Sequence, residues 1–213
     1  YGLRVIARDQ AGNTTPASNS TFSFTVDQTP PGDPTLALTD PNTSSNVYIR
    51  QQLVNINVGN DTGIAKWCVS ESQSTKPATS SATCNGGAGG SAGWFTTEPT
   101  TYTMANGTNE LKTVYVWTAD VAGNVSANAV SQTITLDSLP PGSFNITGAT
   151  GNLDATADAF LGTTTTVTAN WNASTDATSY DVTIKDAAGS ATVCATENTA
   201  STSVTFNGCT LVD

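Results

Sequence analysis

One sequence motif, which we call the repeated phrase, occurs twice in this chain of 213 residues, and its two copies begin about 110 residues apart. The first copy contains Val5, Ala7, Asp9, Ala11, Gly12, Asn13, Val26, Asp27 and Pro30-Pro31-Gly32. The second copy contains Val116, Thr118, Asp120, Ala122, Gly123, Asn124, Leu136, Asp137 and Pro140-Pro141-Gly142. A phrase that returns at this spacing predicts a repeated domain. Because one copy lies at the very start, we expect the chain to be a piece of a longer array.

The residues around both copies predict β-strands rather than helices. Charged residues make up only 11% of the chain, and helix formers such as Glu, Lys and Leu are scarce beside Thr and Val. Short runs of alternating apolar and polar residues are separated by Gly, Asn, Asp and Pro, which is typical of a β-sandwich. The sequence therefore predicts an all-β fold built from tandem sandwiches.

The predicted strands divide the chain into three strand-bearing segments joined by two linkers. Residues 1–27 carry the last two strands of a domain, and apolar residues alternate along them: Leu3, Val5 and Ala7, then Phe22, Phe24 and Val26. Residues 28–34 are a linker that its prolines stiffen. Residues 35–137 form a complete domain of seven predicted strands, at 35–39, 46–50, 53–58, 64–70, 102–104, 113–119 and 130–136.

The second linker and a second incomplete domain follow. Residues 138–142 repeat the proline-bearing linker, and residues 143–213 carry strands predicted at 143–147, 164–171, 179–185, 191–195 and 202–206. We expect this domain to lack its last strands, so that the fold is incomplete at both ends.

Four cysteines lie in two local pairs, Cys68 with Cys84 and Cys194 with Cys209. Three connectivities are open. Local pairing would close a loop of about 15 residues in each case, which contributes about 3 kcal/mol in the chain-entropy model. Zinc is the alternative, but the sequence has no His and no C-x-x-C to complete a tetrahedral site. We favour two local disulfides and therefore an oxidising, exported location.

The charge of the chain limits the partners that it can have. The net charge is −10, so the surface repels phosphate backbones and predicts no nucleic acid partner. The carboxylates either keep the protein soluble or supply ligands for a hard cation such as calcium. We find no stretch that predicts a membrane span. Four lysines, Lys66, Lys76, Lys112 and Lys185, are scattered along the chain and are expected to be solvated.

A long insertion separates Cys68 from Tyr102. Its glycine-rich run at 86–90 lacks the G-K-[ST] ending of a phosphate-binding loop. Loops of this length are functional or disordered. Either Trp94 tucks against the sandwich above a surface loop, or the aromatic residues of this region stack on sugar rings. The candidate ligand aromatics are Trp94, Phe95 and Tyr102.

The last segment resembles a fibronectin type III domain. Trp171, followed by Tyr180 and Val182, is similar to the B and C strands of that family, with its core Trp and Tyr-x-Val strand. The family's later Tyr-x-x-x-Val-x-Ala strand resembles residues 1–7 instead. The two incomplete segments therefore look complementary. Two explanations stay open: a shifted frame in one long tandem array, or subunits that complete one another head to tail by strand donation.

The phrase as a whole resembles the tandem immunoglobulin-like and fibronectin type III repeats of large bacterial surface proteins and adhesins. The resemblance implies a role as a rigid stalk in a fibre at the cell surface, with neighbouring repeats, copies of the chain, or a surface glycan or protein as partners. The alternative is a carbohydrate-binding or spacer module of a secreted hydrolase. Some such families bind calcium between domains, which implies as ligands Asp9, Asp27, Asp33, Asp120 and Asp137. The alternative is that Asp9 and Asp120 cap turns through their side chains, and that Asp27 and Asp137 end strands.

Enzymatic activity is not expected. No His is available to activate a Ser or Cys nucleophile, and no carboxylate pair lies in a recognisable catalytic motif. We therefore predict no catalytic residue and no cofactor, apart from the calcium that the resemblance implies.

Overall fold

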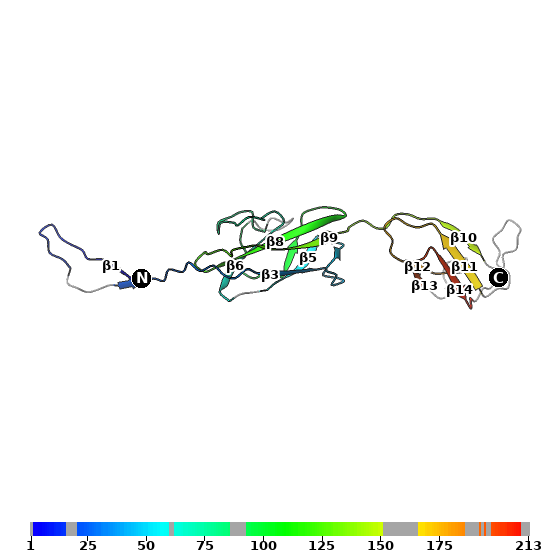
Figure 1. The fold of residues 1–213 in the computed structure, drawn as a ribbon, viewed down its shortest axis with the longest axis horizontal. Helices are drawn as coiled ribbons and strands as arrows, with labels where there is room; N and C mark the ends of the chain where they lie inside the picture. Colours follow the sequence, from blue (N-terminus) through cyan, green and yellow to red (C-terminus); the bar gives the residue numbers. More distant parts are fainter. Residues whose placement is uncertain are drawn as a thin grey trace. The chain divides into compact units, whose positions relative to one another are not determined.

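The computed structural model describes residues 2–15, 21–59, 62–85, 93–150, 166–185, 192, 194 and 197–209. The regular structure in these ranges consists of β-strands, β1 to β14 (Figure 1). The chain divides into two compact units, Tyr1–Leu139 (unit 1) and Pro140–Asp213 (unit 2). The all-β prediction is confirmed. None of the described residues belongs to a helix that could span a membrane.

Unit 1 contains a sandwich of two sheets. One sheet has the order β3-β5-β7, with strands Thr35–Thr39, Leu53–Gly59 and Thr101–Thr103. The other has the order β4-β9-β8-β6, with strands Tyr48–Ile49, Val130–Leu136, Glu110–Asp120 and Ile64–Ser70. All neighbouring strands are antiparallel except β4 and β9, which are parallel. This strand order is that of an immunoglobulin-like sandwich.

The core of unit 1 lies between these sheets and follows from alternation along the strands. In β5 the inward residues Val54, Ile56 and Val58 are at most 4% exposed, whereas their neighbours reach solvent. The strand period of two places one apolar face against the opposite sheet. The buried residues of the cluster are Leu36, Leu38, Ile49, Val54, Ile56, Val58, Trp67, Val69, Tyr102, Met104, Val114, Val116, Ile134 and Leu136.

The insertion between β6 and β7 packs on the outer side of β8. Both local disulfides are present, Cys68–Cys84 here and Cys194–Cys209 in unit 2, so the predicted pairing is confirmed. The first of them lies in a second cluster with Trp117, against which Trp94 packs. The glycine-rich residues 86–90 lie outside the described part of the chain.

A separate hairpin precedes the sandwich in unit 1. Strand β1 (Gly2–Arg4) pairs antiparallel with β2 (Thr21–Ser23), and the connection includes a bridge between Arg8 and Thr14. The two predicted strands therefore pair with each other, although each is shorter than predicted.

Unit 2 has two small sheets. The first has the order β10-β11-β14, with strands Ile146–Thr150, Thr166–Trp171 and Ser203–Asn207. The second pairs β12 (Tyr180–Val182) with β13 (Glu197–Thr199). The buried cluster contains Val167, Cys194, Phe206 and Cys209. The strand predicted at 191–195 falls largely outside the described residues, and β13 begins after it.

Candidate functional site

The two copies of the phrase fold into the same turn. In the second copy the Asp120 carboxylate accepts hydrogen bonds from the backbone N–H and the side-chain amide of Asn124, both at 2.8 Å. In the first copy Asp9 accepts the same two bonds from Asn13, also at 2.8 Å. Each turn therefore has an Asp at its start and an Asn that closes it, as the spacing in the phrase requires.

The glycine of the phrase is required by the backbone of this turn. Gly12 and Gly123 have φ angles of +91° and +92°, in the left-handed region that residues with a Cβ rarely adopt. The Gly12 and Gly123 N–H groups also donate to the Asp9 and Asp120 carbonyls, at 3.1 and 3.3 Å. The sequence Asp-x-Ala-Gly-Asn therefore specifies one type of turn, because its Asp, Gly and Asn each meet a requirement of that turn.

Hydrogen bonding makes the turn carboxylates stronger acids. Donation by the side chain and backbone of Asn13 lowers the pKa of Asp9 below its ordinary value of 3.8. For Asp120 burial is the largest influence and by itself raises the pKa, but the bonds donated by Asn124 and the turn backbone outweigh it, so the pKa is lowered. Both groups are therefore held as acceptors near neutral pH.

The loop between β8 and β9 also holds the linker that precedes the sandwich. The Asn124 side-chain amide donates to the Asp27 carbonyl at 3.1 Å and to the Thr29 carbonyl at 3.5 Å. The backbone N–H and side chain of Asn128 donate to the Asp33 carboxylate at 2.8 and 2.7 Å. We call Asn124, Asn128 and the linker residues Asp27, Thr29 and Asp33 the linker clamp.

Sequence reasoning missed the two asparagines of the linker clamp. Asn124 belongs to the repeated phrase, and its place there marks it as a residue of a turn. The phrase alone does not indicate that this asparagine contacts Thr29, 95 positions away. Asn128 has no counterpart in the first copy, where Ala17 stands at the matching place. The linker is thus fixed by hydrogen bonds in addition to its prolines.

Four of the five proposed calcium ligands have carboxylates that accept hydrogen bonds within unit 1. Asp9 and Asp120 close turns, Asp33 accepts from Asn128, and Asp27 accepts from the Thr29 N–H at 3.0 Å. Asp137 lies just after β9, where its N–H donates to the Ile49 carbonyl, and its carboxylate oxygen Oδ1 is buried without a hydrogen-bond partner among the described residues. Among the described residues no three side chains of the metal-binding types gather at one point. Calcium binding stays a prediction.

The three candidate ligand aromatics lie in different surroundings. Tyr102 is 4% exposed and belongs to the main core, so its ring cannot stack on a sugar. Phe95 packs against that core and forms a bridge with Trp67. Trp94 packs against the cluster around Trp117, and its indole N–H donates to the Ala78 carbonyl at 3.1 Å.

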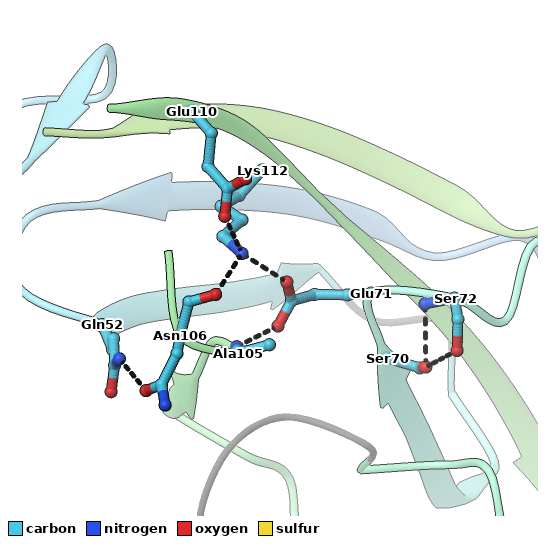
Figure 2. A network of polar contacts seen from close by, with 8 residues as sticks. All are labelled: Gln52, Ser70, Glu71, Ser72, Ala105, Asn106, Glu110 and Lys112. Carbon is cyan, nitrogen blue, oxygen red and sulfur yellow. Dashed lines mark hydrogen bonds and ion pairs between the residues drawn. The ribbon is translucent and has the colours of Figure 1, made fainter. Parts of the chain in front are cut away.

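Lys112 is buried, which corrects the prediction that it is solvated. Its ammonium lies 2.5 Å from the Glu110 carboxylate and 3.5 Å from that of Glu71, and it donates to the Asn106 carbonyl at 3.4 Å (Figure 2). The hydrogen bond to Glu110 is the main cause that raises the pKa of Lys112, while burial opposes it. Glu71 also accepts from the Ala105 N–H, so the network ties the strands β6 and β8 to the segment after β7.

Unit 2 carries a shallow pocket of about 280 Å³. Tyr180 of β12 lines it, and its ring packs edge-on against Phe144 and Trp171 at centroid distances of 5.6 and 5.3 Å. Phe144 is 49% exposed. The Tyr180 hydroxyl accepts from the Ser174 N–H at 2.9 Å, which fixes the ring.

Comparison with protein-family models and with curated proteins gives no match. Among solved structures, the chain is similar to the fibronectin(III)-like modules of Clostridium thermocellum CbhA, with 16% sequence identity and a TM-score of 0.35. The match covers 64% of this chain and 62% of that one, which is less than two thirds of its length. The strand order and the core described above carry the fold assignment.

Proposed function

We propose that this chain is a non-catalytic structural segment of an exported bacterial surface fibre or adhesin. In that fibre the sandwich of unit 1 acts as a rigid domain that resists unfolding under tension. The observation that carries the proposal is the parallel pairing of β4 with β9, Tyr48 with Thr135 and Ile49 with Leu136.

Parallel pairing determines how a load acts on unit 1. A pull transmitted along a fibre enters β4 from its N-terminal side and leaves β9 at its C-terminal end. Because the two strands are parallel, these forces slide one strand along the other, so the interstrand hydrogen bonds are loaded together rather than opened one by one. Those bonds include Thr135 N–H to the Val47 carbonyl at 2.9 Å and Asp137 N–H to the Ile49 carbonyl at 2.8 Å.

The linker clamp supports the same proposal. A stalk needs linkers that do not fold back, and residues 28–34 combine fixed proline φ angles with hydrogen bonds from Asn124 and Asn128. Two disulfides are typical of exported proteins and oppose unfolding. All four cysteines are oxidised and the chain has no His, so neither a Cys nucleophile nor a His base is available.

Single-molecule stretching of the full chain with Thr135→Pro tests the tension-bearing role. The Thr135 N–H faces β4, so proline removes one β4–β9 bond without removing a donor to β8. Thr133→Pro is the matched control, because Thr133 lies on the same strand but is not among the residues paired with β4.

We expect Thr135→Pro to lower the peak unfolding force of unit 1 and Thr133→Pro to lower it less. Equal forces in the wild-type chain and the Thr135→Pro variant would show that β4 and β9 do not carry the load, and would remove the main support for a mechanical role.

A further inference from the structure

One of the three asparagine–glycine pairs of the chain, Asn106–Gly107, is surrounded by groups that favour a reaction between its two residues. Asn106 follows β7 and lies beside the buried ammonium of Lys112 (Figure 2). In such a pair the backbone nitrogen of the glycine can attack the side-chain amide of the asparagine, because glycine has no Cβ to hinder the approach. The product is a succinimide ring, and hydrolysis of the ring replaces the amide by an acid.

The backbone N–H of Gly107 is available for this attack. Among the described residues it has no hydrogen-bond partner, so no existing bond has to break first. Asn106 is exposed and Gly107 is half-buried, so water reaches the pair. The nucleophilic nitrogen and the water that the hydrolysis needs are therefore both accessible.

The Glu110 carboxylate lies where the reaction needs a base. A Cβ added to Gly107 would collide with Oε1 of Glu110 and would lie 3.1 Å from the Lys112 ammonium. The carboxylate therefore occupies the space beside the Gly107 Cα, where it can accept the proton of the glycine N–H. Lys112 holds Glu110 in this place through the ion pair of 2.5 Å.

The two carbonyl oxygens that take part in the reaction each have a hydrogen-bond donor. The side-chain Oδ1 of Asn106 accepts from the Gln52 amide, and the backbone oxygen of Asn106 accepts from the Lys112 ammonium at 3.4 Å (Figure 2). The first oxygen gains negative charge when the ring closes, and the second gains it when water opens the ring at the backbone carbonyl. Donors that already point at developing charge lower the barrier to such steps.

We propose that Asn106–Gly107 is a self-modifying site, which converts to isoaspartate without a separate enzyme. In the first step the Gly107 nitrogen forms a bond to Cγ of Asn106. Its proton passes through the Glu110 carboxylate to the departing side-chain nitrogen, and the Cγ–Nδ2 bond breaks with release of ammonia. In the second step water adds to the backbone carbonyl carbon of residue 106, and the bond from this carbon to the Gly107 nitrogen breaks.

The Lys112 ammonium directs the second step toward isoaspartate. Opening the ring at the backbone carbonyl turns that carbonyl into a free carboxylate, and Lys112 already lies 3.4 Å from its oxygen. The new carboxylate becomes a third anionic partner of Lys112, beside Glu71 and Glu110. The main chain then runs through the former side chain of residue 106. The modification therefore alters the segment that the Lys112 network ties to β6 and β8.

The other two asparagine–glycine pairs lie in different surroundings. Asn85 is 4% exposed, so water has little access to its side chain. Asn207 belongs to β14, where it pairs with Thr166, and its side chain accepts from the Thr166 hydroxyl at 3.4 Å. A Cβ added to Gly208 would meet no described atom within 4 Å, so no carboxylate of the described residues lies beside that glycine. The two pairs serve as references within the same chain.

Peptide mapping by mass spectrometry tests the site on the full chain, kept folded at neutral pH in water enriched in heavy oxygen. Hydrolysis of the succinimide places one heavy oxygen in residue 106, and methylation by an isoaspartyl methyltransferase identifies the isoaspartate. The same incubation in concentrated urea gives the rate that the sequence alone sets. Glu110→Gln removes the base. Glu71→Gln is the matched control, because it also takes one carboxylate from Lys112 but leaves the one beside Gly107.

We expect Asn106 to be converted faster in the folded chain than in urea, and Asn85 and Asn207 to be converted more slowly in the folded chain than in urea. Glu110→Gln should slow the conversion on the order of 100-fold, which is what a positioned general base contributes, and Glu71→Gln should slow it far less. Asn85 reports whether unit 1 of each variant is folded, because unfolding exposes it. If Glu110→Gln unfolds, the comparison of the wild-type chain with and without urea decides.

An Asn106 amide that stays intact in the folded chain, or that is converted no faster than in urea, would overturn the proposal. A folded Glu110→Gln chain that keeps the wild-type rate would also overturn it, and so would a product that contains only aspartate. Each of these results would leave the tension-bearing role of unit 1 untouched, because stretching with Thr135→Pro measures that role separately.

Discussion

At the scale of single residues, Asp120 links the turn after β8 to the linker through Asn124. Its carboxylate orients Asn124, and Asn124 in turn holds the backbone of the linker at Asp27 and Thr29. The identical turn at Asp9 has no such role within the described residues, since its Asn13 donates to Asp9 itself. The same local chemistry thus has different consequences according to what the turn is packed against.

Replacing Asp120 with Ala should destabilise unit 1 by about 1–2 kcal/mol, because two donors of Asn124 lose a charged acceptor and the linker loses its support. Urea unfolding followed by tryptophan fluorescence measures the change. Asp9→Ala is the control, and it should change the unfolding free energy of unit 1 by less than about 0.5 kcal/mol. Equal losses for the two variants would contradict a special role of the second turn.

Acid should destabilise unit 1 through these same carboxylates. The pKa values of Asp33 and Asp120 are lowered in the folded chain, in Asp33 chiefly by hydrogen bonds from Asn128 and in Asp120 by bonds that outweigh burial. Their stabilising effect is therefore complete above the ordinary pKa of 3.8 and is lost as the pH falls through the lowered folded values.

Urea midpoints measured from neutral pH downward should stay level until about pH 3.8 and then fall. In Asp120→Asn the fall should be smaller, because that side chain no longer takes up a proton on unfolding. A midpoint that rises in acid would contradict the lowered pKa values.

At the scale of elements, the disulfide Cys68–Cys84 is the main link between the insertion and the sandwich. Both cysteines are 0% exposed and lie in the cluster with Trp117. Replacing both with Ala should destabilise unit 1 by about 2–4 kcal/mol, since the closed loop spans 16 residues and two buried groups shrink. Differential scanning calorimetry measures the shift.

The matched control removes Cys194 and Cys209, which close a loop of similar length in unit 2. This variant should leave the transition of unit 1 unchanged. A loss of unit 1 stability in the control, or none in the Cys68 and Cys84 variant, would show that the insertion is held in some other way.

The alternation of apolar and polar residues predicted the strands well where the two faces of a strand differ in polarity. The strands β3, β6 and β9 begin and end at the predicted residues. Strand β8 begins earlier than predicted, at Glu110, because Glu110 and Lys112 look like surface residues in the sequence. The ion pairs of Lys112 with Glu71 and Glu110 depend on strands brought together only by the fold, so no local pattern could reveal them.

The candidate site was predictable only in part for the same reason. The spacing of Asp, Gly and Asn predicted the turns, but not that Asn124 reaches the linker. The aromatic residues of the insertion are close in sequence, yet the strand register sends Tyr102 into the main core and leaves Trp94 against the outer cluster.

At the scale of the whole molecule, the two copies of the repeated phrase lie in different structural surroundings. One copy completes the sandwich of unit 1, and the other forms a hairpin whose inward face is exposed. The central claim for the whole molecule is that the sandwich of unit 1 bears tension.

Stretching single wild-type chains, oxidised and then reduced, tests this central claim most directly. We predict that unit 1 unfolds in one discrete step, and that reduction lengthens the step by about 50 Å, because the disulfide withholds a 16-residue loop of about 3.5 Å per residue. A smooth extension without a step, or a step of the same length with and without reductant, would contradict the claim that unit 1 bears tension and is cross-linked by the disulfide Cys68–Cys84.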